Sequence, residues 1–166
     1  MFEELKGGIL FFLGKMSSER GQWKRAQGLL QQALRFDPGL FKGYDYLGEA
    51  LLRQEKLSEA RVVFEKAVEK DEEDEMAFYF LGRIELLEGN PEKAAPFLEK
   101  ALSLTPRFPD AHFFLGRAKL LSGKAEEARK SFQCACTLDP NLAKRRWKEF
   151  LKSHALSGPE GLPQDS

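Results

Sequence analysis

The feature that most constrains this chain is an internal repeat with a period of 34 residues. The stretch FYFLGRIELLEGNPEKA, starting at Phe78, matches HFFLGRAKLLSGKAEEA, starting at His112, at a Leu-Gly-Arg triplet, a Leu-Leu pair and later small residues. The same register extends through four copies, marked by the leucine–glycine pairs Leu13-Gly14, Leu47-Gly48, Leu81-Gly82 and Leu115-Gly116. A fixed period in this range is typical of stacked repeat units, each too small to bury its apolar face alone.

Each unit is predicted to contain two helices, as the third unit illustrates. Apolar residues recur at helical spacing from Phe78 to Leu87. Gly89–Pro91 then interrupts the helix and begins a second one, because Asn is a good N-cap and Pro suits the first helical position. A second apolar stripe runs from Ala94 to Ala101, and Pro106 ends it. Small residues at Gly82 and Ala94 are expected to let the two helix backbones approach closely.

This pattern of Leu-Gly, Ala, Phe or Leu, Ala and Pro resembles the tetratricopeptide repeat. The resemblance implies an all-α, right-handed superhelical solenoid of antiparallel helix pairs, in one domain spanning residues 1–156. Its repeats would cover about 7–40, 41–74, 75–108 and 109–142, followed by a capping helix at 143–156. The Gly- and Pro-containing tail, 157–166, is expected to be disordered. The second unit departs from the pattern because Glu55 replaces the glycine between the helices.

Composition narrows the function classes. The 26 basic and 26 acidic side chains cancel, whereas a nucleic-acid partner requires a basic excess. No apolar run is long enough to span a bilayer, and we expect a cytoplasmic protein with its two cysteines, Cys134 and Cys136, reduced. No nucleophile, phosphate-loop or metal-ligand pattern is present, so we expect no enzyme activity, cofactor or metal. His112 is interpreted as a packing residue, because other units carry Leu or an aromatic residue there.

Candidate binding residues follow from the resemblance, which places the first helix of each unit on the concave side. This implies an aromatic and partly basic groove whose lining is Phe11, Lys15, Asp45, Glu49, Leu52, Tyr79, Arg83, Leu86, Phe113, Arg117, Leu120 and Trp147. Two alternatives remain open at this point. The aromatic residues could pack between neighbouring helices, and the arginines could pair with local carboxylates such as Glu85 and Glu88.

The groove predicts a protein–protein interaction scaffold or adaptor. Its aromatic and leucine residues would bury a peptide or an amphipathic helix, and Arg83 and Arg117 would select acidic residues of that partner. The alternative hypothesis is a self-associating assembly protein whose groove receives the terminal helix of another copy.

Overall fold

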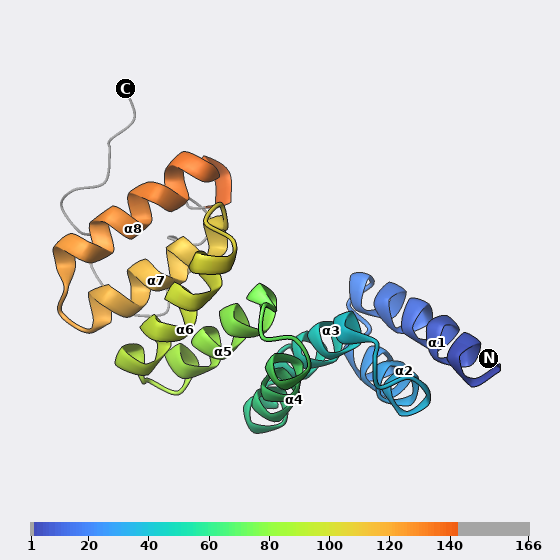
Figure 1. Cartoon of the computed structure of the whole chain (residues 1–166). Coiled ribbons are helices and arrows are strands. Elements are labelled where there is room, and N and C mark those ends of the chain that lie inside the picture. The colour runs from blue at the N-terminus through green and yellow to red at the C-terminus, as the bar shows by residue number, and fades with distance from the viewer. Residues whose placement is uncertain (1, 143–166) are drawn as a thin grey trace.

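The computed structural model describes residues 2–142, and in this range the chain forms eight α-helices joined by short turns (Figure 1). The helices are α1 (Phe2–Glu19), α2 (Trp23–Phe36), α3 (Phe41–Leu52), α4 (Leu57–Lys70), α5 (Glu75–Leu87), α6 (Pro91–Leu104), α7 (Pro109–Leu121) and α8 (Ala125–Leu138). The prediction of an all-α solenoid of helix pairs is therefore confirmed. The proposed capping helix, with Trp147, and the tail lie outside the described residues.

The helices pack in sequence, each against the one before it and the one after it. In Figure 1 the pairs follow one another from α1 and α2 at one end to α7 and α8 at the other. Helices α3, α5 and α7 begin at the first residue of the predicted second, third and fourth units. Helix α1 is longer than these three, because it begins at Phe2, ahead of the predicted first boundary at residue 7.

The first helices of the units form one continuous layer. Helix α1 contacts α3, α3 contacts α5, and α5 contacts α7. Within the described residues no second helix contacts the second helix of the next unit, so α2, α4, α6 and α8 spread apart. In a curved stack, the layer whose members stay in contact is the inner one. The inner face is therefore built from α1, α3, α5 and α7.

Each helix pair is held together by a glycine of the first helix, against which a large side chain of the second helix packs. A Cβ atom added to Gly82 would lie 2.6 Å from Cγ of Leu98, and one added to Gly116 would lie 2.7 Å from Cε1 of Phe132. The corresponding partners in the first two units are Leu30 and Phe64, both fully buried. The recurring Leu-Gly pair thus reflects a steric requirement at the helix crossing.

The turn between the helices of a unit requires a left-handed backbone conformation. Gly21, Gly89 and Gly123 occupy it with φ of 71°, 80° and 77°, and Glu55 occupies it in the second unit with φ of 61°. Glu55 is the only non-glycine residue with positive φ among the described residues. A side chain in this conformation costs roughly 1–2 kcal/mol, so the second turn is strained.

The junctions between units are also repeated in detail. The Tyr44 hydroxyl donates to the carbonyl of Pro38 (3.4 Å), and Nε2 of His112 lies 2.9 Å from the carbonyl of Pro106. These pairs are equivalent under the repeat, which agrees with the interpretation of His112 as a packing residue. At the intervening junction, the carboxylate of Asp74 caps α5 by accepting from the backbone N–H groups of Met76 and Ala77.

The steric role of the glycines predicts opposite effects for two glycine-to-alanine substitutions. Gly82→Ala is expected to lower the free energy of unfolding by ~1–3 kcal/mol, because the added Cβ collides with Leu98. Gly28→Ala, inside α2 with open space around it, is expected to raise it by ~1 kcal/mol through helix propensity. Urea unfolding of both variants measures the difference. Equal effects would contradict the crossing geometry.

The strained turn predicts that Glu55→Gly stabilises the protein by about 1 kcal/mol, because glycine adopts positive φ without a steric penalty. The matched change, Gly89→Ala, introduces a Cβ at the equivalent turn and is expected to destabilise by a similar amount. Thermal and urea unfolding distinguish the two. A Glu55→Gly variant less stable than wild type would show that Glu55 contributes contacts outweighing its backbone strain.

Candidate protein-binding face

Cations of the inner face lie over aromatic rings of the next unit. Nζ of Lys15 in α1 is 5.9 Å from the ring centre of Tyr46 in α3, and Cζ of Arg83 in α5 is 5.0 Å from that of Phe114 in α7. The two pairs are equivalent under the repeat. A cation above the face of an aromatic ring is attracted by the negative potential of its π system. These contacts therefore also hold neighbouring first helices together.

Arg83 is the most aromatic-rich of these sites. Its Cζ lies 5.5 Å from the ring centre of Tyr79 and 5.4 Å from that of Phe80, in addition to Phe114. The side chain is half-buried. Within residues 2–142 no carboxylate lies within ion-pair distance of its guanidinium. The guanidinium of Arg83 is therefore held against aromatic rings and is able to bind a carboxylate.

The nearby carboxylates Glu85 and Glu88 are engaged by another arginine. Nη1 of Arg61, in α4, lies 2.7 Å from Oε1 of Glu85, and its Nη2 lies 2.7 Å from Oε2 of Glu88. Asn90 also donates to Glu85 (3.1 Å). This clamp ties α4 to the end of α5. The alternative that Arg83 pairs with these two glutamates is therefore not what the structure shows, because both of them bind Arg61.

The predicted lining residues divide into two layers. Tyr79 and Phe113 are 4% and 2% exposed, so they form a floor beneath the cations. Phe113 packs against Phe132 of α8 (5.4 Å between ring centres), and Tyr79 packs against Phe108 (4.8 Å). Asp45 and Leu86 are also buried. Residues that remain partly accessible are Phe11, Lys15, Glu49, Leu52, Arg83, Arg117 and Leu120.

The second unit forms an acidic interruption of the cation row. Glu49 stands where the other units carry Lys15, Arg83 and Arg117, and it pairs with Arg53 at 3.2 Å. Asp45 lies on the same face and is almost fully buried. Burial, and next the charge and hydrogen bond of Asp74, raise the pKa of Asp45 to about 7, although Lys42, at 3.5 Å, acts in the opposite direction.

Sequence reasoning missed two features of this region. The influence of Asp74 on the pKa of Asp45 acts between residues of different units, and no local sequence pattern predicts it. The second aromatic residue of the second and fourth units, Tyr46 and Phe114, lies beneath a cation of the preceding unit. The sequence did contain a signal for these contacts. Tyr46 and Phe114 stand at one repeat position, and Lys15 and Arg83 precede them by the same number of residues.

Other classes of site find no support in residues 2–142. No group of three or more His, Cys, Asp or Glu side chains could hold a metal ion there. Among the same residues, no helix has the length and apolar character needed to cross a membrane.

Comparison with known proteins agrees with the architecture. Models of the tetratricopeptide repeat match residues 9–40, 46–107 and 85–133. The chain is 27% identical to a protein in a crystal structure of MamA, with a TM-score of 0.73, over 83% of this chain and 81% of that one. No curated protein matches it by sequence.

Two further solved structures share the fold alone. MamA 41-end from Desulfovibrio magneticus RS-1 is 23% identical with a TM-score of 0.73, over 90% of this chain and 89% of that one. TTC0263, described as a thermophilic TPR protein in Thermus thermophilus, is 21% identical with the same TM-score, over 88% of this chain and 81% of that one.

The helix-pair solenoid with a continuous inner layer defines a helical-repeat scaffold for protein–protein interaction. The chain belongs to the tetratricopeptide repeat proteins.

The raised pKa of Asp45 predicts a pH-dependent cost of folding. The native state retains a proton that the unfolded chain, with a pKa near 3.8, releases, so this group lowers stability as pH rises from about 4 to about 7. Asp45→Asn removes the ionisation and is expected to be more stable than wild type above that range, with the gap closing in acid. Urea unfolding at a series of pH values measures it. A difference in stability between the variant and the wild type that stays the same at every pH would contradict this assignment.

Proposed function

We propose that this protein is an adaptor that binds a peptide or helical segment of a partner protein along its inner face. The residues that would contact the partner are the accessible ones of that face: Phe11, Lys15, Glu49, Leu52, Arg83, Arg117 and Leu120. Tyr79, Phe113 and Leu86 would act from beneath, by fixing the positions of the residues above them.

This proposal rests mainly on the surroundings of the Arg83 guanidinium. A half-buried guanidinium has lost part of its hydration, and in this protein Arg61 recovers that loss through two carboxylates at 2.7 Å. Arg83 lies over three aromatic rings and has no carboxylate within ion-pair distance among the described residues. Arginine binds a carboxylate through two parallel hydrogen bonds, and flanking rings hold it in the required plane. An incoming carboxylate would supply what the chain itself does not.

The charge pattern along the face indicates the character of the ligand. Arg83 and Arg117 stand one repeat apart, and the accessible Leu120 follows Arg117 one turn further along α7. A ligand with acidic and apolar residues in alternation matches this half of the face. Glu49 in the second unit would repel such a ligand, so we place its acidic part over the third and fourth units.

A phage-displayed library of random peptides provides a direct test. Selection on the wild-type protein is expected to enrich sequences in which Asp or Glu alternates with apolar residues. The affinity of a selected peptide is then measured by calorimetry. Arg83→Gln should weaken binding at least ~10-fold, since a hydrogen bond to a charged group contributes about 1.5–3 kcal/mol.

The control is Arg35→Gln, the same substitution at an exposed arginine of α2, away from the inner face. It should leave the affinity unchanged. Enrichment of peptides without acidic residues, or equal affinities for the wild type and a correctly folded Arg83→Gln variant, would contradict the proposed role of Arg83.

A further inference from the structure

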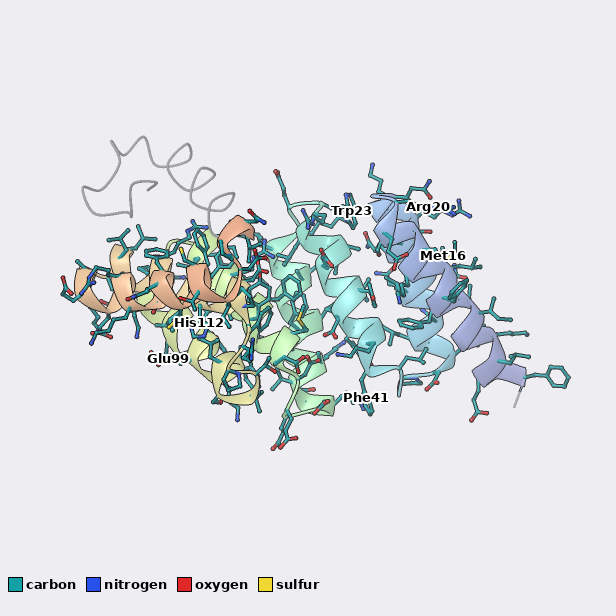
Figure 2. All side chains as sticks on the ribbon, turned by 90° about the horizontal axis from the view of Figure 1, so that it is seen from above. Met16, Arg20, Trp23, Phe41, Glu99 and His112 are labelled. Carbon is teal, nitrogen blue, oxygen red and sulfur yellow. The ribbon has the colours of Figure 1, made fainter. Side chains whose placement is uncertain are left out.

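Helix α1 carries an exposed apolar stripe on the side opposite its contact with α2. The stripe comprises Phe2, Leu5, Ile9 and Phe12, which are 78%, 61%, 53% and 59% exposed, and continues with the half-buried Met16. Leu13 lies at its margin with 40% exposure. Figure 2 shows α1 at the edge of the solenoid, with Met16 in its last turn and Arg20 just past its end. A contiguous apolar surface of this kind on a folded chain usually marks an interface.

The repeat shows what this surface does elsewhere in the molecule. Ile9 and Met16 correspond to Gly43 and Ala50 in α3, and these are buried where α3 packs on α2. The equivalents in α5 and α7 are fully buried in the same way, at Ala77, Ile84, Ala111 and Ala118. The stripe is thus the continuation of the surface that joins successive units, and within residues 2–142 no helix covers it on α1.

The side chains of the stripe differ from those of the internal junctions. An internal junction needs a small residue, because a Cβ on Gly43 would already lie 3.0 Å from Cδ2 of Leu34. Helix α1 has Ile9 at that position and extends the stripe by Phe2 and Leu5, which the other first helices lack. These bulky residues suit interdigitation with another bulky helix at a wider spacing, as in a coiled coil.

The stripe is complementary to itself in an antiparallel arrangement. Phe2, Leu5, Ile9, Phe12 and Met16 follow alternating spacings of three and four residues over two heptads, the pattern of a coiled-coil seam. Ile9 is its midpoint, so a second α1 running in the opposite direction would place Ile9 against Ile9 and Phe2 against Met16.

Charge follows the same symmetry. The first turns of α1 carry Glu3, Glu4 and Lys6, a net charge of −1, whereas Lys15, Glu19 and Arg20, the residue just past the helix, give the other end a net charge of +1. An antiparallel pair brings the acidic end of each helix to the basic end of the other. We propose that α1 is a homodimerisation helix, which pairs antiparallel with α1 of a second copy through the stripe centred on Ile9. A lipid surface is a poorer match, because α1 contains three glutamates and only two lysines and so lacks the cationic excess that binds anionic lipids.

The test uses the full chain and two charged variants at the midpoint. Sedimentation equilibrium of the wild type at several concentrations is expected to show a reversible dimer. Ile9→Lys and Ile9→Glu should each raise its dissociation constant roughly 100-fold or more, since each places like charges face to face and removes two buried isoleucines. Mixed in equal amounts, the two variants should associate again, because Lys then faces Glu across the axis.

The matched control is Val62→Lys on α4, at 50% exposure and away from the stripe, which should leave the dimer intact. Circular dichroism confirms folding, and Ile9 is exposed enough for both variants to fold. A wild type that stays monomeric, a dimer that survives Ile9→Lys, or a mixture that fails to associate would overturn the proposal. So would a monomer that binds phosphatidylcholine–phosphatidylserine vesicles through the same residues.

Discussion

The close approach of two helices at a glycine is the constraint on which the rest of this structure depends. At each crossing, a leucine or phenylalanine of the second helix occupies the space that a Cβ on the first helix would fill. This fixes the distance within each pair, and with it the angle at which the next pair must stack. Four repetitions of one crossing therefore produce a regular inner layer. Residues 34 positions apart are brought to the same face by that regularity alone.

Above the buried aromatic residues of the inner face, the residues at one repeat position differ from unit to unit. Lys15, Glu49, Arg83 and Arg117 occupy one repeat position, yet they differ in charge and in their contacts. Lys15 and Arg83 lie over the aromatic residue of the next unit, whereas Glu49 turns to Arg53. An anion above a ring face would be repelled, so the acidic residue needs a different partner. The aromatic floor thus constrains which charges can stand above it.

The fold was predictable from the sequence because the same helix and turn pattern recurs in four units, so each copy supports the interpretation of the others. The helix starts at residues 41, 75 and 109 follow from the register, and the unusual turn was visible as Glu55 in a column of glycines. The site was less predictable. The family resemblance implied that Tyr79 and Phe113 lie on the inner side, but it could not say that both would be covered. Burial depends on side chains from elsewhere in the chain, such as Phe108 and Phe132, and the raised pKa of Asp45 depends in part on Asp74 of the next unit.

The two proposed surfaces of α1 are compatible with each other. Phe11 packs against Tyr46 on the side of α3, at 5.9 Å between ring centres, whereas Ile9 and Phe12 point away from the stack. Pairing through the stripe would therefore leave both inner faces open. Under the two proposals, two such faces held in one assembly would bind a partner with two acidic segments more tightly than either would alone, because the second contact becomes intramolecular. Helix α1 would then also set the valency of the scaffold.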